Sequence, residues 1–234
     1  MSSLTVVIPF FNEEKYLAQL VSELEGLPPG LVAEFIFIDD GSSDESVKVL
    51  KASLKNTTLK TSIHSKVNGG KASAIEYGSK FLTTSHVLIL DADLELATSD
   101  IPRLWGIVLE NRSDVVFGYR NFISQSSFTW RYAKGNHLIS NLYGLLFNEV
   151  ITDIMCGYKL VPSDFLQSIP YKFKKYAIEI EIPIHLWEKG IRPFEVQVEY
   201  IPRSRSDGKG ITVKDAAKII LTLITYRFLK ARRK

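Results

Sequence analysis

Short runs rich in β-branched and aromatic residues alternate with helix-like segments through the first half of the chain. The apolar runs occupy residues 4–10, 34–40, 61–65 and 86–93, and the helix-like segments occupy residues 13–27, 43–55 and 71–82. Such alternation is typical of βαβ units, in which helices cover both faces of a parallel sheet and the strands are apolar throughout. The sequence therefore predicts an α/β fold with a mostly parallel central sheet flanked by helices.

The second half of the chain is less regular. We predict a strand at 114–120, a helix at 135–150, an irregular segment with a turn and a short helix at 151–166, a helix at 174–191 despite Pro183, a strand at 192–202 and a final helix at 213–234. Apolar and polar residues alternate in RPFEVQVEYIP, which is typical of an exposed edge strand.

The charge balance argues against a nucleic-acid-binding protein. The 234 residues include 29 lysines and arginines and 26 aspartates and glutamates, so the net charge is only +3. Proteins that bind nucleic acid usually present a far more basic surface. The single cysteine, Cys156, excludes an internal disulfide and a cysteine-rich zinc site, which fits a reducing compartment.

Two further features predict a cytoplasmic protein. The first residues, MSSLTVVIPFFNEE, reach acidic residues too early for the basic start and apolar run of a signal peptide. The longest apolar stretch starts at Ile219, contains threonines and an arginine, and falls short of the ~20 residues that span a bilayer.

The final helix has features of a helix that lies on a membrane. Ile219, Ile220, Leu223, Ile224 and Phe228 form an apolar stripe, and five basic residues without an acidic one crowd the last eight positions. Such a helix would contact acyl chains and anionic headgroups, so we expect peripheral contact with the cytoplasmic face of the membrane. The alternative is that the stripe packs on the core and the tail is solvated.

Polar and acidic residues follow three of the predicted strands: Asn12 and Glu13, Asp39 and Asp40, and Asp91 and Asp93. In an open α/β sheet the ligand binds outside the carboxyl ends of the strands, so a nucleotide and metal site is predicted there. Each acid could instead cap the next helix, but capping does not require a second carboxylate two residues after Asp91.

A proton on one of the two aspartates, instead of a metal ion, would also make two neighbouring carboxylates tolerable. In phosphatases of the haloacid-dehalogenase type one aspartate is a nucleophile and the other an acid. That pair usually follows the first strand, whereas Asp91 and Asp93 follow a later one and Glu95 stands nearby. A dinucleotide-dependent enzyme is also disfavoured, because no GxGxxG follows the first strand.

Five motifs resemble, in order and spacing, the GT-A domain of glycosyltransferase family 2: VVIPFFNEEKYL, FIDDGSSDES, NGGKASAIEYG, LILDADLE and DVVFGYR. The segments TDIMCGYKLV, AIEIEIP and VEYIPRSRSDGKG resemble the branch of polyprenyl-phosphate sugar synthases, such as dolichyl-phosphate mannose synthase. The resemblance covers nearly the whole chain. It implies a catalytic domain at residues 1–212 and an amphipathic C-terminal helix with a basic tail at residues 213–234.

The resemblance implies where the nucleotide-sugar donor binds. Pro9, Phe11 and Glu13 would line the base and ribose pocket, with Asp40 nearby, and Asp39 would support the loop or the base. The base is commonly uracil or guanine in this family, and Phe11 stands in place of a tyrosine that is frequent in the mannose synthases, which weakens the case for guanine.

The phosphates and the donor sugar would meet the third and fourth motifs. Asn68 and Lys71 belong to a glycine-containing segment that allows close backbone approach, and the lysine would meet a phosphate. Asp91 and Ala92 would lie beside the donor sugar or ribose.

A divalent cation is the cofactor that the resemblance implies. Mg²⁺ or Mn²⁺ would stabilise the departing diphosphate, and both prefer hard oxygen ligands. Asp93 would be the main ligand, Asp91 a second and Glu95 a further residue on the metal side.

The acceptor decides which other residues are needed, because a hydroxyl requires a general base and a lipid phosphate requires cations. Five basic residues fall where the lipid-phosphate branch has them: Arg120, Arg131, Arg203, Arg205 and Lys209. Asp153 also matches a position of this branch, and Glu179 and Glu181 match its pair of carboxylates on a helix. Asp153 or Glu181 would act as the base for a hydroxyl, or would orient the arginines or close the site for a phosphate.

The resemblance therefore implies an inverting, metal-dependent glycosyltransferase that moves a sugar from a UDP- or GDP-sugar to a polyprenyl phosphate at the cytoplasmic membrane face. The main rival within the fold is transfer to a carbohydrate hydroxyl of a surface polysaccharide or glycolipid. A membrane-binding module with a degenerate sugar site is a rival from another class, against which Asp91, Asp93 and Arg120 argue.

Overall fold

The computed structural model describes residues 2–121, 130–171, 178–201 and 213–231, with side chains for all of these except residues 130–132, 213 and 229–231. The strands are β1 Leu4–Phe10, β2 Glu34–Asp39, β3 Thr61–Ser65, β4 His86–Ile89, β5 Val116–Arg120, β6 Lys159–Pro162 and β7 Phe194–Val198. The helices are α1 Leu17–Glu25, α2 Ser46–Ser53, α3 Lys71–Ser79, α4 Ile101–Leu109, α5 Trp130–Phe147, α6 Ser163–Ser168, α7 Ile178–Glu188 and α8 Val213–Ala231. Two short 3-10 helices are η1 Leu54–Asn56 and η2 Thr98–Asp100.

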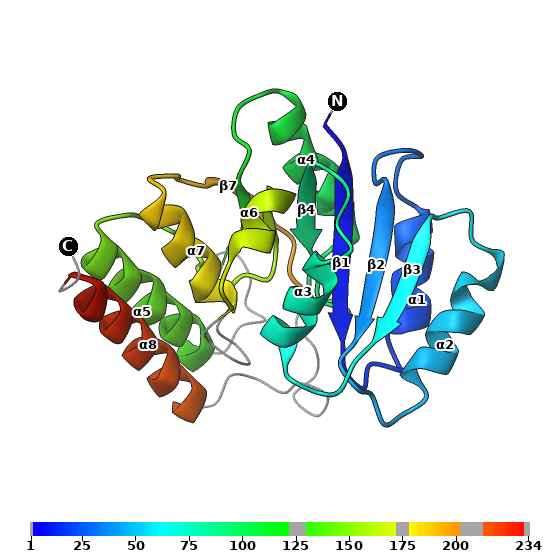
Figure 1. The fold of residues 1–234 in the computed structure, drawn as a ribbon, viewed down its shortest axis with the longest axis horizontal. Helices are drawn as coiled ribbons and strands as arrows, with labels where there is room; N and C mark the ends of the chain where they lie inside the picture. Colours follow the sequence, from blue (N-terminus) through cyan, green and yellow to red (C-terminus); the bar gives the residue numbers. More distant parts are fainter. Residues whose placement is uncertain (1, 122–129, 172–177, 202–212, 232–234) are drawn as a thin grey trace.

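The strands form one sheet in the order β3-β2-β1-β4-β6-β5-β7 (Figure 1). Strands β1 to β4 pair in parallel, and β5 pairs in parallel with β7. Among the strands of the described ranges, β6 alone is antiparallel to its neighbours, β4 and β5. The prediction of a mostly parallel sheet is confirmed, and so is the edge position of the strand at 192–202.

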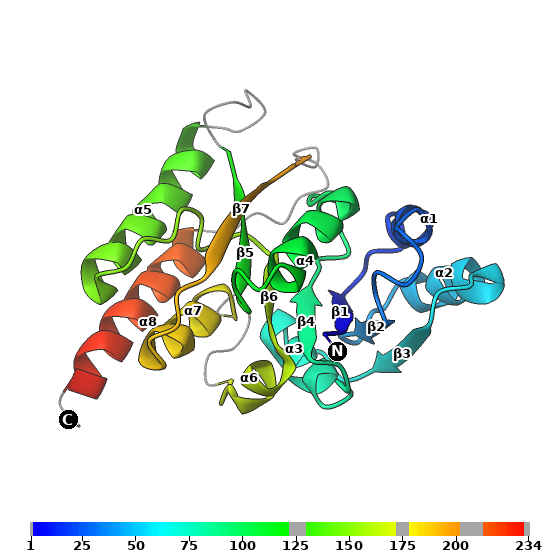
Figure 2. The same ribbon diagram turned by 90° about the horizontal axis from the view of Figure 1, so that it is seen from above.

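Helices cover both faces of the sheet, as Figure 2 shows from above. Two hydrophobic clusters hold them there. One cluster joins α1, α2 and α4 to side chains such as Val6, Ile8 and Leu88. The other joins α3, α5, α6, α7 and α8 to the opposite face, through Val7 and Val87 among others. Neighbouring residues of one strand thus enter different clusters, which explains why the strands are apolar at every position.

The strand β6 corrects the prediction for residues 151–166. The short helix in that segment is confirmed as α6, but residues 159–162 form a central strand rather than irregular structure. Lysine and proline at its two ends hide the strand from a reading based on propensity. Pairing on both sides stabilises it, with Val161 opposite Val87 and Leu160 opposite Val116.

The final helix, α8, has apolar residues on both its buried side and its exposed side. Ile219 and Leu223 are buried in the same cluster as α5 and α7, so two of the five residues of the predicted stripe pack on the core. The opposite side of α8 nevertheless carries Leu221 and Phe228, which are 64% and 61% exposed.

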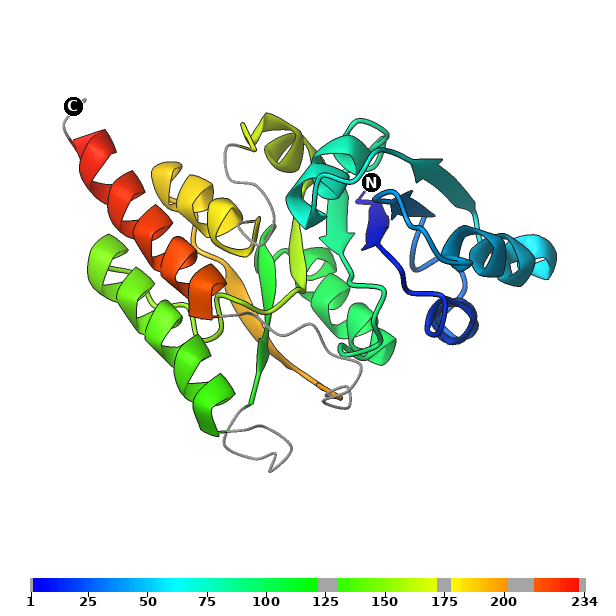
Figure 3. The same cartoon turned by 90° about the horizontal axis from the view of Figure 1, so that it is seen from below.

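The helix α5 lies beside α8 on the outside of the molecule, as Figures 1 and 3 show. Its outward side carries Leu138 and Leu145, which are also exposed. We call the exposed apolar residues of this layer the α5–α8 outer face: Leu138, Leu145, Leu221, Ile224 and Phe228. Within the described ranges, no helix is long and apolar enough to cross a bilayer.

Two leucines of α8 test how the helix packs. Leu223→Ala should lower the free energy of unfolding by about 2–5 kcal/mol, because it removes a fully buried side chain and leaves a cavity. Leu221→Ala, two residues earlier on the exposed side, should change it by less than about 0.5 kcal/mol. Urea unfolding followed by circular dichroism measures both, and equal effects would contradict the docking of α8 on the core.

Candidate active site

The predicted donor-side residues of the first half lie along one edge of the sheet. Because β1, β2 and β4 run parallel, the residues at their carboxyl ends meet at the lower edge in Figure 1. Pro9 and Asp39 lie at the carboxyl ends of β1 and β2, and Asp91 follows β4. This is the edge at which open α/β sheets bind their ligands.

Hydrogen bonds fasten the loops after β1 and β2 to each other. Asn12 has a left-handed backbone (φ 57°), and its side-chain oxygen accepts from Ser43 N at 2.8 Å. The buried Asp39 accepts from Ser42 N at 2.8 Å and so supports this loop. Phe11 and Glu13 lie in the β1 loop, where their contact with a base remains a prediction.

Asp40 organises the loop that precedes α3. Its carboxylate accepts hydrogen bonds from Lys66 Nζ at 2.8 Å, Gly69 N at 3.0 Å and Gly70 N at 2.7 Å. Gly70 has φ 87°, a conformation that favours glycine. Asn68 is exposed in the same loop. The buried Asp40 thus shapes the predicted phosphate-binding segment from beneath.

Lys71, the first residue of α3, joins two carboxylates from distant parts of the chain. Its Nζ lies 2.6 Å from Asp91 Oδ1 and 2.7 Å from Glu179 Oε1. Burial alone would lower the pKa of Lys71, but the two carboxylates outweigh burial and raise that pKa above its ordinary value. The ammonium therefore stays charged and neutralises part of the acidic edge.

Gly157 leaves room for the Asp91 carboxylate. A Cβ at Gly157 would overlap Asp91 Oδ2, so a larger residue there would shift the carboxylate that Lys71 holds. Gly157 lies just before β6, and the antiparallel pairing of β6 with β4 brings it to this position. The missed strand therefore has a direct consequence for the site.

The loop Asp93–Glu95 has a strained backbone. Leu94 has φ 59°, which is rare for a residue with a branched side chain. Asp93 Oδ1 accepts from Glu95 N at 3.1 Å, and the Glu95 carboxylate accepts from the hydroxyl of Tyr200 at 3.0 Å. Asp93 and Leu94 also line a cavity of about 530 Å³ between α1, η2 and the end of β7.

The donor set of this edge suits Mg²⁺ or Mn²⁺. Asp91, Asp93 and Glu95 offer only hard oxygen ligands, and Asp91 already has a cation, the Lys71 ammonium, beside it. Within the described residues no three His, Cys, Asp or Glu side chains are grouped closely enough to hold a metal. Mg²⁺ commonly binds through one or two carboxylates together with phosphate and water, so these residues fit a metal that arrives with a diphosphate.

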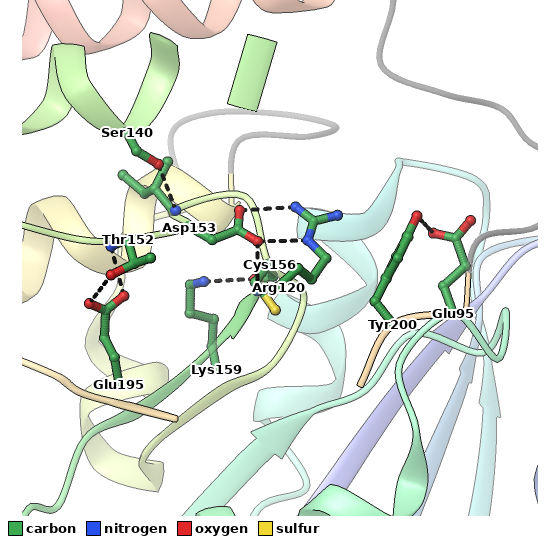
Figure 4. Close-up of polar contacts among 10 residues, drawn as sticks. Glu95, Arg120, Ser140, Thr152, Asp153, Cys156, Lys159, Glu195 and Tyr200 are labelled. Atoms are coloured by element: carbon green, nitrogen blue, oxygen red, sulfur yellow. Dashed lines mark hydrogen bonds and ion pairs between the residues drawn. The ribbon is translucent and has the colours of Figure 1, made fainter. Parts of the chain in front are cut away.

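The residues on the predicted acceptor side form a buried ion pair (Figure 4). Arg120 Nε lies 2.6 Å from Asp153 Oδ2, a second guanidinium nitrogen lies 3.0 Å from Oδ1, and Arg120 N donates to Oδ2 at 3.2 Å. Both side chains are almost fully buried. Asp153 is thus held by a bidentate pair plus a backbone donor, and such pairs are strong and rigid.

Lys159 is a second buried basic residue near this pair (Figure 4). Its Nζ donates to Cys156 O at 2.7 Å and lies 4.4 Å from the Phe117 ring centroid. Burial lowers the pKa of Lys159, and the charges of Asp153 and Glu179 oppose that shift. Burial also raises the pKa of the Cys156 thiol to about 11, which leaves it protonated and unreactive.

The two glutamates of α7 have different environments. Residues two apart on a helix point about 200° away from each other, so Glu179 and Glu181 cannot share a face. Glu179 contacts Lys71, and its Oε2 is buried without a hydrogen-bond partner among the described residues. Glu181 is fully buried, with Oε1 3.9 Å from His185 Nε2.

Several predicted site residues are placed only in part. The side chain of Ala92 is buried in the core. Arg203, Arg205 and Lys209 lie outside the described residues, and so does the side chain of Arg131. Their roles as acceptor-phosphate ligands remain predictions.

Two residues of the site, Lys159 and Tyr200, were not predicted from the sequence, and Glu179 was predicted only as one of a pair of carboxylates on a helix. The lysine could have been noticed, because a lysine inside the apolar run CGYKLV is unusual for a strand. Nothing in the sequence pairs Glu179 with Lys71, which is 108 positions away.

The family model for glycosyl transferase family 2 matches residues 5–169. An uncharacterized protein of Methanocaldococcus jannaschii is 27% identical over 242 residues, which cover 96% of this chain and 99% of that protein. An undecaprenyl-phosphate 4-deoxy-4-formamido-L-arabinose transferase of Edwardsiella ictaluri is 26% identical over 208 residues, covering 88% of this chain and 62% of the relative.

Solved structures of glucosyl-3-phosphoglycerate synthase from Mycobacterium tuberculosis share the fold. The complex with Mn²⁺, UDP and glucosyl-3-phosphoglycerate has a TM-score of 0.72 and 19% sequence identity, and the match covers 97% of this chain and 80% of that chain. The complex with phosphoglyceric acid has a TM-score of 0.73, with 20% identity and the same coverage.

The Arg120–Asp153 pair predicts a measurable charge imbalance. Arg120→Met should lower the free energy of unfolding by about 3–5 kcal/mol, because it leaves the buried Asp153 carboxylate without its cation. The double variant Arg120→Met/Asp153→Asn should recover part of this loss, since no buried charge is then left unpaired. Urea unfolding measures each variant.

The control for this test is the exposed pair Lys48–Glu45. Lys48→Met should cost no more than about 1 kcal/mol. If Arg120→Met costs no more than Lys48→Met, the buried pair is not the clamp described above.

Proposed function

The chain belongs to glycosyl transferase family 2 and is a glycosyltransferase with the GT-A fold, and from this premise we propose that it transfers a sugar, with inversion, from a nucleotide-sugar to a polyprenyl phosphate. The reaction is metal-dependent and takes place at the cytoplasmic face of the membrane. The donor is a UDP- or GDP-sugar.

The hydrogen bonds of Asp153 are the observation that favours a phosphate acceptor over a hydroxyl acceptor. A hydroxyl acceptor needs a base with a free oxygen, but both oxygens of Asp153 accept hydrogen bonds from Arg120. Glu181, the other predicted base, is fully buried. A phosphate acceptor is already an anion and needs no base, so the arrangement favours a phosphate.

The donor side supports a nucleotide-sugar. Asp93, with Asp91 or Glu95, would hold Mg²⁺ or Mn²⁺ together with the phosphates of the donor, and the metal when bound would stabilise the charge on the departing diphosphate. Lys71 stands beside the same carboxylates and would orient a phosphate oxygen. Asp40 keeps the loop with Asn68 in position for the donor, and the walls around Pro9, Phe11 and Glu13 would take the base and ribose.

The relatives agree with parts of this proposal. The Edwardsiella ictaluri relative is named for an undecaprenyl-phosphate acceptor. The mycobacterial synthase was solved with UDP-glucose and Mn²⁺, and with phosphoglyceric acid, whose phosphate is not carried by a lipid.

The α5–α8 outer face supports contact with the membrane. Five apolar side chains point away from the core there, and α8 leads into the basic cluster Arg227, Lys230, Arg232, Arg233 and Lys234. Apolar side chains beside basic ones suit a bilayer with anionic headgroups. A lipid acceptor would then be reached from the membrane surface.

The first test is nucleotide release from a panel of UDP-, GDP- and dTDP-sugars, with and without a short polyprenyl phosphate. Wild-type release should be stimulated by the lipid phosphate and abolished by EDTA. Asp93→Ala should lower the rate about a hundredfold or more, because losing the metal removes several kcal/mol of transition-state stabilisation.

The matched control is Asp164→Ala, an exposed aspartate on α6. It should leave the rate unchanged. If Asp93→Ala and Asp164→Ala release nucleotide equally well, Asp93 is not a metal ligand.

A hydroxyl acceptor is the second candidate, and Glu179 is the observation in its favour. Its buried Oε2 has no hydrogen-bond partner within the described residues, so it could accept a proton. Release that ignores the lipid phosphate, is stimulated by a carbohydrate and is lost in Glu179→Gln would support this candidate over the lipid phosphate.

Membrane contact gives an independent prediction. Wild type should float with vesicles that contain phosphatidylglycerol. The affinity of Leu221→Gln/Phe228→Gln for these vesicles should be lower by about tenfold or more, because two exposed apolar side chains are lost. Leu109→Gln, an exposed leucine of α4 on the other side of the sheet, should bind like wild type. Flotation that is equal for all three proteins would refute the role of the outer face, and a dimer broken by the double variant would assign this face to a second copy.

A further inference from the structure

Tyr200 contacts both the metal side and the acceptor side of the site. Its hydroxyl donates to Glu95 Oε2 at 3.0 Å, and its ring lies under Arg120, with the guanidinium carbon 5.2 Å from the ring centroid. Figure 4 shows the tyrosine between Glu95 and the Arg120–Asp153 pair. The side chain is 7% exposed.

The backbone around Tyr200 is joined to the same loop. Residue 200 forms an antiparallel bridge with Leu96, and Ile201 N donates to Glu95 O at 2.9 Å. The main chain at Tyr200 is therefore held to this loop independently of the contacts of the side chain. A side chain held in this way can set the position of groups on both sides.

We propose that Tyr200 is a positioning residue that holds the metal loop Asp93–Glu95 and the Arg120 guanidinium in a fixed relation. Its two contacts use different parts of the side chain. The hydroxyl positions Glu95 and thereby the carboxylates on the metal side. The ring face supports the guanidinium, which is already oriented by Asp153. The effect of Tyr200 on turnover rests on the proposed function, whereas its contacts do not.

Two substitutions separate the two contacts. Tyr200→Phe removes only the hydroxyl and keeps the ring under Arg120. It should raise the Mn²⁺ concentration for half-maximal nucleotide release about tenfold, as losing an outer-shell partner commonly does. The KM for a short polyprenyl phosphate should stay within about twofold of wild type. Tyr200→Leu removes both contacts, so it should raise that KM as well.

Tyr158→Phe is the matched control. Tyr158 is also a buried tyrosine, and its hydroxyl donates to Ala97 O at 2.9 Å in the loop that follows Glu95. The variant loses a buried hydroxyl of the same kind near the same loop. It should lower the melting temperature as Tyr200→Phe does, but the Mn²⁺ dependence should not change.

A readout without turnover completes the test. Mn²⁺ binding in the presence of UDP, measured by the loss of the free-ion electron paramagnetic resonance signal, should be about tenfold weaker in Tyr200→Phe. In the unliganded protein, Tyr200→Phe and Glu95→Ala should lower the melting temperature non-additively, because each removes the same hydrogen bond.

The outcomes distinguish this inference from the proposed function. Additive melting shifts, or a Tyr200→Phe variant that binds and uses Mn²⁺ like wild type, would overturn the inference while wild-type release with lipid phosphate stands. A wild type that releases no nucleotide from any donor would overturn the proposed function. The melting shifts and Mn²⁺–UDP binding would then still decide whether Tyr200 positions the loop.

Discussion

The site depends on the two ion pairs that the Lys71 ammonium forms with Asp91 and Glu179. Three parallel strands deliver acidic residues to one edge of the sheet, and such an edge would repel itself without a cation. Lys71 joins Asp91 from the end of β4 to Glu179 from the start of α7, at 2.6 and 2.7 Å. This contact ties the donor half of the fold to the second half and holds the Asp91 carboxylate in place.

The second half of the chain also pairs a buried carboxylate with a cation. Asp153 has Arg120 as its partner, and Lys159 of β6 donates to the Cys156 carbonyl nearby. Two cations, Lys71 and Arg120, thus pair with three carboxylates: Asp91, Glu179 and Asp153. A cluster of paired side chains can be rigid before any ligand arrives, which lowers the reorganisation that a charged donor and acceptor require. Removing one member leaves a buried charge uncompensated, so the cluster is sensitive to single substitutions.

Local patterns predicted much of this molecule from its sequence. The apolar runs predicted β1 to β5, the alternation in residues 192–202 predicted an edge strand, and the strand ends predicted where Asp39, Asp40 and Asp91 meet. Long-range pairing was not predictable. β6 is a strand because two neighbours pair with it, and Glu179 faces Lys71 only because the fold brings the start of α7 to the start of α3. The stripe on α8 was visible in the sequence, but which of its residues α5 and α7 cover was not.

Anomalous diffraction from crystals grown with Mn²⁺ and UDP would locate the metal directly. A manganese peak is expected about 2 Å from a carboxylate oxygen of Asp93, with the Arg120–Asp153 pair intact. A manganese bound away from Asp91 and Asp93, or a UDP bound without metal contact to either aspartate, would contradict the assignment of this edge as the donor site.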